Sequence, residues 1–183
     1  MIKLNRKIWF VRHAQSEYNK LQLFTGWHDP ELTQKGIDVA KKLKEELSSI
    51  SFDYVFSSPL KRAASTVQSI INDDNKIQYD DRLKERSYGS WSGLNKSEIK
   101  SQVGEKRFFS ARRGWETRPP EGESLKDVSI RVKKFLDDLP DQGKILVVSH
   151  GNTIRAISVL LGINSESEVS SYEIKTGTYL LVE

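Results

Sequence analysis

Two of the three histidines in the sequence occupy matching positions. His13 follows the apolar run 8–11 after one arginine, and His150 follows the apolar run 145–148 after one serine. A short, continuous apolar run is typical of a strand buried on both faces. Open α/β sheets bind ligands at the carboxyl ends of their strands, so both imidazoles are candidates for one site. The alternative is that each is a hydrogen-bonded loop histidine, but the matching contexts favour a shared site.

The residues around the two histidines suit phosphate chemistry. A neutral imidazole is a nucleophile that forms covalent intermediates. Phosphoryl transfer otherwise needs mainly positioning and cations around the phosphate oxygens. Arg12 adjoins His13, Arg62 falls in the first turn of a predicted helix after another strand, and a helix N-terminus follows His150. Such a terminus stabilises anions, so the sequence predicts a phosphate pocket. For Arg62 alone, a solvated helix charge is the alternative interpretation.

A proton donor for the leaving oxygen is also required. Glu85 is one candidate among 25 acidic residues, because it precedes an irregular glycine-containing loop, but the residue pattern alone does not select it. His28 lies in a polar loop and is interpreted as a surface residue. The sequence contains no cysteine, no His-Glu-x-x-His motif and no Walker-type loop. No metal site is therefore predicted.

Strands alternate with helices along the chain, which predicts a three-layer αβα sandwich around a mostly parallel sheet. Three helix starts are predicted: at Thr33, at Ser58 with Pro59 in the first helical position, and at Ser124 in a capping box with Asp127. We expect Ile37 to join the buried stripe of the first of these helices. The strands are predicted at residues 8–11, 54–56, 77–79 and 145–148, with an edge strand at 179–182.

The 183 residues suit a single domain over 1–183, with a small helical lid inserted at about 83–120. A formal net charge of +4 is mild and by itself indicates only a solvated basic surface; binding of anionic small molecules is one alternative, and binding of nucleic acid is a weaker one because no nucleic-acid motif is present. Residues 1–10 lack the pattern of a signal peptide, and no apolar run reaches membrane-spanning length. Together with the absence of cysteine, this predicts a cytoplasmic location.

The stretch Val-Arg-His-Ala-Gln-Ser-Glu at 11–17 resembles the Arg-His-Gly signature of the histidine phosphatase superfamily. Within that superfamily, the chain resembles the cofactor-dependent phosphoglycerate mutases, in a short bacterial form. Phe-Thr-Gly-Trp at 24–27, Gly-Leu-Asn-Lys at 93–96 and the arginine pair at 112–113 are the more mutase-specific matches. Further matching stretches lie at 32–36, 57–63, 83–89, 119–120, 123–125, 150–152, 155–156 and 175–177.

The resemblance implies a role for each matching residue. His13 would be the phosphorylated nucleophile, and Glu85 the proton donor and acceptor. The transferred phosphoryl group would be held by Arg12, Arg62, His150, Asn19 and the amide of Gly151, with Thr25 and Gly26 lining the pocket. The carboxylate and the second phosphate of the substrate would be bound by Tyr88, Lys96, Arg112, Arg113 and Asn152.

The implied function is an isomerase that interconverts 2- and 3-phosphoglycerate in glycolysis and gluconeogenesis. It would work through a phosphohistidine primed by 2,3-bisphosphoglycerate, without a metal. The expected partner is the small substrate, with no nucleic acid and no membrane; a homodimer is compatible with the resemblance. The alternatives are a phosphatase of small phosphorylated metabolites and a non-catalytic module that binds phosphate esters. The second alternative would predict loss of His13 or Glu85, and both are present.

Two features of the sequence depart from the mutase pattern. Ala14 replaces the usual glycine after the nucleophile, and the chain stops at Glu183, soon after the last predicted strand. Many family members carry a further tail that helps to cover the site. We therefore expect poorer exclusion of water and some shift from mutase towards phosphatase activity.

Overall fold

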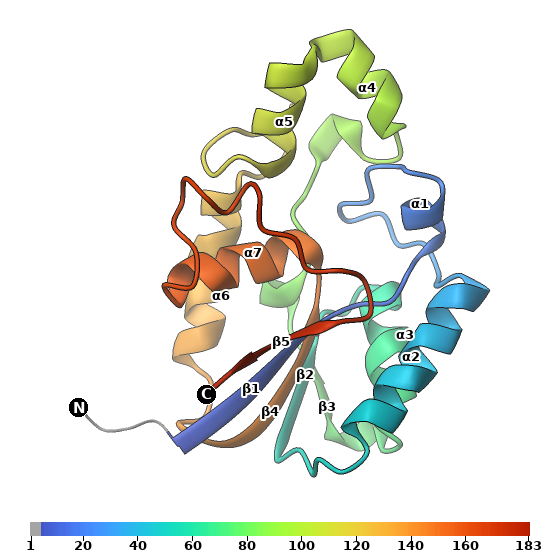
Figure 1. Cartoon of the computed structure of the whole chain (residues 1–183), viewed down its shortest axis with the longest axis vertical. Helices are drawn as coiled ribbons and strands as arrows, with labels where there is room; N and C mark the ends of the chain where they lie inside the picture. The colour runs from blue at the N-terminus through green and yellow to red at the C-terminus, as the bar shows by residue number, and fades with distance from the viewer. Residues whose placement is uncertain (1–4) are drawn as a thin grey trace.

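The computed structural model describes residues 5–183. Residues 1–4, part of the N-terminal stretch examined for a signal peptide, lie outside the described residues. The described chain forms one five-stranded sheet in the order β3-β2-β4-β1-β5, parallel except for β5, which runs antiparallel to β1 (Figure 1). The strands are β1 (Asn5–Arg12), β2 (Tyr54–Ser57), β3 (Ile77–Tyr79), β4 (Gln142–Ser149) and β5 (Tyr179–Val182).

Helices cover both faces of the sheet, which confirms the predicted sandwich (Figure 1). The pair α6 and α7 packs on one face and the pair α2 and α3 on the other, while α4 and α5 extend beyond the end of the sheet. None of the helices within residues 5–183 combines the length and apolar character needed to cross a membrane. The helices are α1 (Glu17–Lys20), α2 (Gln34–Leu47), α3 (Lys61–Ile70), α4 (Lys96–Val103), α5 (Glu105–Arg113), α6 (Leu125–Asp137) and α7 (Gly151–Leu160), with short 3₁₀ turns η1 (Asp74–Lys76), η2 (Asp81–Leu83) and η3 (Gly89–Trp91).

The strand β1, which lies between β4 and β5, is buried on both faces, as its apolar run predicts. Ile8 and Phe10 pack into the cluster beneath α6 and α7, whereas Trp9 and Val11 pack into the cluster beneath α2 and α3. Side chains alternate between the faces of a strand, so four consecutive apolar residues are needed to serve two cores. This double burial fixes the register of β1, because a slip by one residue would exchange the two faces.

Most of the predicted helix starts are confirmed. The Thr33 hydroxyl accepts the N–H of Gly36 at 2.9 Å, and Ser124 forms its capping box with Asp127. The prediction for Ser58 is wrong: α3 begins two residues later than expected, at Lys61, and has no side-chain cap. The Ser58 hydroxyl accepts the N–H of Leu60 in the turn before α3 and is also hydrogen-bonded to a buried histidine.

The predicted buried stripe of α2 is confirmed except at its first position. Ile37 is exposed, and Gly36 faces inward instead, where an added Cβ would lie 2.2 Å from the carbonyl oxygen of Gln15. This close approach of backbone to backbone brings the start of α2 against the loop after β1. The apolar spacing therefore identified the helix but misplaced one edge of its buried face.

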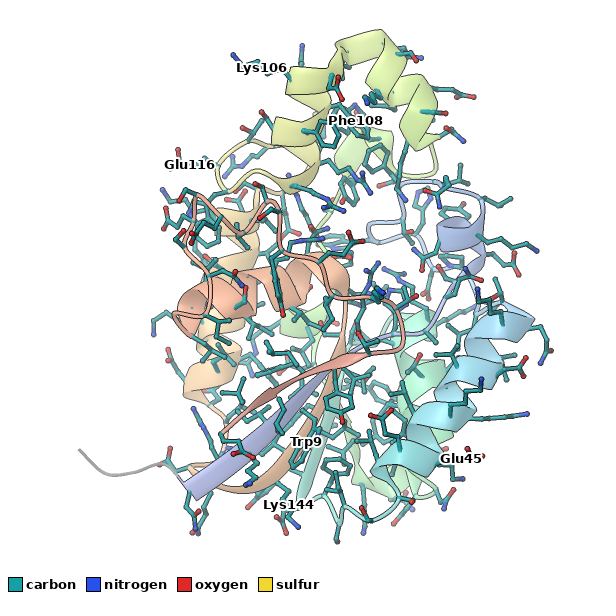
Figure 2. All side chains as sticks on the ribbon, viewed as in Figure 1. Trp9, Glu45, Lys106, Phe108, Glu116 and Lys144 are labelled. Atoms are coloured by element: carbon teal, nitrogen blue, oxygen red, sulfur yellow. The ribbon has the colours of Figure 1, made fainter. Side chains whose placement is uncertain are left out.

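The segment predicted as a lid carries α4, α5 and an aromatic cluster of its own. Phe24, Tyr88, Trp91 and Phe108 form the centre of that cluster, and Figure 2 shows Phe108 directed inwards beneath α5 while Lys106 projects outwards. The cluster is separate from the two sheet cores, so α4 and α5 depend on it for most of their apolar burial.

A single buried arginine ties the carboxyl end of α5 to the rest of the molecule. Arg86 is fully buried, and its guanidinium donates to the carbonyl oxygens of Ala111, Arg112, Thr117 and Glu123. The last carbonyls of a helix have no partner within the helix, and a cation is favourable there. Arg86 therefore fixes where α5 ends and so where its last two arginines stand.

Candidate active site

The two histidines meet at the carboxyl ends of neighbouring parallel strands. Arg12 of β1 pairs in register with Ser149 of β4, so the residues that follow them, His13 and His150, are brought together. Their ring centroids are 5.0 Å apart, and both side chains are almost fully buried. The strand register alone thus produces the pairing that the matching sequence contexts predict.

The surroundings of His13 leave it a neutral base with one free nitrogen. Its Nδ1 lies 2.6 Å from the carbonyl oxygen of Ala14, which can only accept, so Nδ1 carries the proton and Nε2 keeps its lone pair. Burial, followed by the charges of Arg62 and Arg12, holds the pKa of His13 well below its ordinary value. The imidazole is therefore uncharged at neutral pH, which is the form that can attack phosphorus.

The contacts of His150 favour a hydrogen-bond donor at its Nδ1 atom. Its Nε2 lies 2.8 Å from the hydroxyl of Ser58, which also accepts the N–H of Leu60. That hydroxyl can then donate to Nε2, which favours the tautomer with its proton on Nδ1. Burial and the charge of Arg62 keep the pKa of His150 well below its ordinary value. His150 Nδ1 is buried and has no hydrogen-bond partner within residues 5–183.

A buried arginine, Arg62, and a half-buried one, Arg12, flank the histidines and are aimed by backbone carbonyls. Arg62 donates to the carbonyl oxygens of His28 at 3.0 Å and Gly26 at 2.9 Å. Arg12 donates to the carbonyl oxygen of Ile174 at 2.6 Å. Burial lowers the pKa of Arg12, and lowers that of Arg62 to about 10, so both remain cations at neutral pH.

The buried donors left over in this cluster call for an oxygen-rich ligand. In the part of the chain that the structure describes, the Nε atoms of Arg12 and Arg62 and the Nδ1 atom of His150 are buried without a partner. Unpaired buried donors are rare and costly, and they mark sites where a ligand supplies the acceptor. We call Arg12, His13, Arg62 and His150 the histidine cluster. Its donors and charge suit a phosphoryl group.

Gly151 lies close to the Arg12 guanidinium of this cluster, where a side chain would be crowded. A Cβ built on Gly151 would lie 3.2 Å from both Nε and Cζ of Arg12, tighter than ordinary van der Waals contact. Gly151 is also the first residue of α7, where backbone N–H groups face an approaching anion. The missing side chain thus lets the Arg12 guanidinium lie against the N-terminus of that helix.

A polar cavity adjoins the histidine cluster and reaches to α4 and α5. Five of its lining side chains are cations and two are carboxylates, so the cavity favours anions. Burial and the neighbouring charge of Arg112 lower the pKa of Lys96 to about 8, and burial lowers that of Arg155 to about 10. The cavity is lined by Arg12, Asn19, Leu23, Thr25, Gly26, Glu85, Tyr88, Lys96, Arg112, Arg113, Gly151, Asn152, Arg155 and Glu173.

Glu85 lies in the cavity wall near Arg12 and Arg62. It is 8% exposed, and its Oε1 accepts the N–H of Arg86 at 2.8 Å. The charge of Glu85 acts to raise the pKa values of Arg12 and Arg62, which places the carboxylate within electrostatic reach of both. A carboxyl group there can exchange a proton with an oxygen of a ligand held by the histidine cluster.

Several polar side chains in the wall are fixed by neighbours from other elements. Arg155 donates from Nη1 to Asn152 Oδ1 at 3.2 Å, and Asn152 donates from Nδ2 to the Tyr88 hydroxyl at 3.0 Å. The Asn19 carboxamide oxygen accepts the N–H of Ser16 at 3.2 Å, which leaves its NH₂ group for a ligand. These contacts hold donors in place before any ligand arrives.

The predicted site residues are found together around this cavity. Those of the histidine cluster beyond Arg12 are almost fully buried beside one another, and the remaining residues all lie in the cavity wall. The sequence analysis missed Glu173, missed Arg86, and gave Arg155 no role although it lies in a matching stretch. Arg155 could have been found as the residue one helical turn after Asn152. Within the described residues, no group of three or more histidine, aspartate or glutamate side chains is arranged to hold a metal ion.

A fold with helices on both faces of a mixed sheet, and a buried histidine pair at the strand ends, defines a known class. Residues 8–183 match the model of the histidine phosphatase superfamily (branch 1), and the chain belongs to this superfamily of enzymes. A 2,3-bisphosphoglycerate-dependent phosphoglycerate mutase of Mesorhizobium japonicum is 39% identical, over 98% of this chain and 93% of that protein.

Solved structures of similar fold carry the names of hydrolases. One, titled mycobacterial hydrolase 1, is 25% identical with a TM-score of 0.87, and covers 96% of this chain and 88% of its own. Another, a mycobacterial glucosyl-3-phosphoglycerate phosphatase, is 25% identical with a TM-score of 0.84, and covers 96% of this chain and 89% of its own. The sequence relatives and the structural neighbours thus point to two activities within one superfamily.

Proposed function

We propose that this enzyme is a phosphoglycerate mutase that interconverts 2- and 3-phosphoglycerate through a phosphohistidine. The observation that carries the proposal is the combination of a neutral, buried His13 with unpaired donors around it and a second group of cations across the cavity. A simple phosphate ester needs only the first group. A phosphoglycerate has an anion at each end and uses both.

At the sheet end of the cavity, the proposed step forms a bond between phosphorus and His13 Nε2 and breaks the bond from phosphorus to the substrate oxygen. Arg12, Arg62 and His150 donate to the phosphoryl oxygens as negative charge spreads over them. Glu85 gives its proton to the departing oxygen and takes one back when the phosphoryl group returns to a hydroxyl. The pKa of His13, held low by burial, keeps the nucleophile free of a proton.

At the other end, the proposal assigns the second anionic group of the substrate to the lid cations, defined as Lys96, Arg112 and Arg113. All three line the cavity together with Tyr88 and Asn152, which are hydrogen-bonded to each other. Arginine offers a planar fork of donors that matches a carboxylate or a phosphate. Binding both ends of the substrate would hold the reacting oxygen near His13.

The relatives are named as dependent on 2,3-bisphosphoglycerate, and the proposal takes this compound as the primer. The cavity fits such a ligand, because it brings cations to both ends and carries unpaired buried donors at the sheet end. When bound, the compound supplies a phosphoryl group for His13. The proposal also includes a place in glycolysis and gluconeogenesis, a cytoplasmic location and no need for a metal, with a homodimer left open.

The second candidate is a phosphatase of small phosphorylated metabolites on the same histidine cluster. It is favoured by the names of the similar solved structures and by the carboxylate of Glu173 among the lid cations. Water would then replace the second hydroxyl as the acceptor of the phosphoryl group. The two candidates share His13 and differ in what the lid cations hold.

A coupled assay of 3-phosphoglycerate turnover, with and without 2,3-bisphosphoglycerate, tests the proposal. We expect formation of 2-phosphoglycerate that depends on the primer and exceeds the release of inorganic phosphate. Release of phosphate from 3-phosphoglycerate without formation of 2-phosphoglycerate would overturn the mutase proposal in favour of the phosphatase. Absence of both would contradict the mutase proposal and exclude 3-phosphoglycerate as the substrate of a phosphatase.

A further inference from the structure

The segment from Tyr172 to Gly177 runs along the cavity and is held from the cavity side. Arg155 donates to the carbonyl oxygen of Tyr172 at 2.7 Å, and Arg12 donates to that of Ile174 at 2.6 Å. The N–H of Gly177 returns a hydrogen bond to the carbonyl oxygen of Arg12 at 3.0 Å. The backbone on both sides of Glu173 is therefore anchored to two arginines of the cavity wall.

Because the backbone is anchored in this way, the carboxylate of Glu173 lies beside one of the lid cations. The side chain of Glu173 lines the cavity, and its Oε2 lies 3.5 Å from Nη2 of Arg113. The Glu173 side chain is 57% exposed, whereas that of Arg113 is only 20% exposed. The negative charge of Glu173 also acts to raise the pKa values of Arg12 and Arg112. Glu173 is thus an anion belonging to the protein, located where a ligand's second anion would bind.

We propose that Glu173 is a specificity-determining residue: it occupies Arg113 as a resident counter-ion, which the second anionic group of a ligand has to displace. This inference rests on the proposed function, because it takes the lid cations to be the second anion site. A ligand with one phosphate meets only the histidine cluster and leaves the ion pair intact. A ligand with two anionic groups brings its second negative charge close to the Glu173 carboxylate, and the repulsion weakens the binding of that ligand.

The same geometry has one purely structural interpretation, in which Glu173 aims Arg113 at the ligand. The two interpretations differ in sign. A resident counter-ion weakens the binding of doubly anionic ligands, so its removal strengthens that binding. An aiming residue strengthens the same binding, so its removal weakens it. Glu173→Gln separates them, because glutamine keeps the shape and an acceptor oxygen but loses the charge.

The experiment compares two ligands that differ only at one end, 3-phosphoglycerate and glycerol 3-phosphate. Their dissociation constants are measured by calorimetry for the parent protein, Glu173→Gln and Glu166→Gln. Glu166 is an exposed carboxylate between α7 and this segment, outside the cavity wall, so it controls for the loss of one charge. We expect Glu173→Gln to bind 3-phosphoglycerate about 3- to 30-fold more tightly, with glycerol 3-phosphate changed less than about twofold.

The outcomes separate this inference from the proposed function. If the parent prefers 3-phosphoglycerate and Glu173→Gln leaves that preference unchanged or reduces it, Glu173 is not a counter-ion and the inference is overturned. If neither protein prefers 3-phosphoglycerate, the lid cations do not bind a second anion, and the mutase proposal falls together with the inference. Unchanged affinity for glycerol 3-phosphate shows that Glu173→Gln is folded. Glu173→Asp provides a second variant, which retains the negative charge on a shorter side chain.

Discussion

The histidine cluster and the lid cations are two cationic regions of one site, and they are held in place by different means. Arg12, Arg62, His13 and His150 are fixed by strand register and by backbone carbonyls, and the two histidines and Arg62 are almost fully buried. The lid cations stand on α4 and α5, which extend beyond the sheet (Figure 1). The end of α5, which carries Arg112 and Arg113, is held by the buried guanidinium of Arg86.

Because of this difference, we expect the histidine cluster to carry out the phosphoryl transfer and the lid cations to select the substrate. The histidine cluster is preorganised, because each of its side chains is positioned before a ligand binds and is shielded from water. The lid cations are half-buried and rest on aromatic rings, with Lys96 5.9 Å from the Phe24 ring and Arg112 5.6 Å from the Phe108 ring. Changes in the histidine cluster should therefore abolish all activities, and changes among the lid cations should alter which substrate is preferred.

Removal of the nucleophile tests the first half of this comparison most severely. We expect His13→Ala to lose about 10⁴-fold or more in turnover of every phosphate ester, because no other group can form the covalent intermediate. Incubation with radiolabelled 2,3-bisphosphoglycerate should give an acid-labile, base-stable phosphoprotein in the parent and not in the variant. His28→Ala is the matched control, since that histidine is exposed. Equal labelling of His13→Ala would rule out His13 as the phosphoryl carrier.

The proton donor should give the next largest effect. Glu85→Gln is expected to lose about 10²–10⁴-fold in turnover number, the usual contribution of general acid–base catalysis. Substrate binding should persist, because the change removes a negative charge and no cation. Glu45→Gln on the outer face of α2 is the control (Figure 2). A turnover number close to that of the parent, measured at saturating substrate, would exclude Glu85 from this role.

The lid cations should give a smaller effect that depends on the substrate. Loss of one charged hydrogen bond to a bound anion costs about 1.5–3 kcal/mol, or roughly 10- to 150-fold. We expect Arg113→Ala to lose that factor in mutase activity and far less in hydrolysis of a generic phosphate ester. Arg107→Ala, an exposed arginine earlier on α5, is the control. An equal fall in both activities would show that the two regions act as one.

The smallest expected effect is a pH dependence located in the lid. Burial, with the charge of Arg112, lowers the pKa of Lys96 to about 8, so this cation is lost as the pH rises through about 8. The KM for 3-phosphoglycerate should then rise about 3- to 10-fold from pH 7 to pH 9. Lys96→Arg should flatten this rise, because arginine keeps its charge. The same rise in both proteins would assign the titration to another group.

The sequence predicted the sheet end of the site well because local signals coincide there. Two continuous apolar runs, each followed closely by a histidine, are sufficient to identify parallel neighbouring strands and a shared site at their ends. The strand positions and two of the three helix caps were confirmed for the same reason, since a buried run and a capping side chain act over a few residues. The catalytic roles themselves remain predictions.

The contacts that sequence reasoning missed all join distant segments. The local pattern at Ser58 predicts a helix cap, but it does not show that the Ser58 hydroxyl is hydrogen-bonded to the distant His150. Arg86 resembles any charged loop residue until the end of α5 is placed over it. Glu173 becomes part of the cavity only because Arg12 and Arg155 hold the neighbouring backbone. No pattern within a short window contains such information.

The pairing of β1 with β4 also has a consequence for the nascent chain on the ribosome. His13 is made with the first strand, but His150 follows a strand near the end of synthesis, and the carbonyl that aims Arg12 comes later still. Contacts between such distant segments form late. A prematurely terminated chain therefore carries His13 without its cluster, and we expect such an incomplete product to have no phosphatase activity.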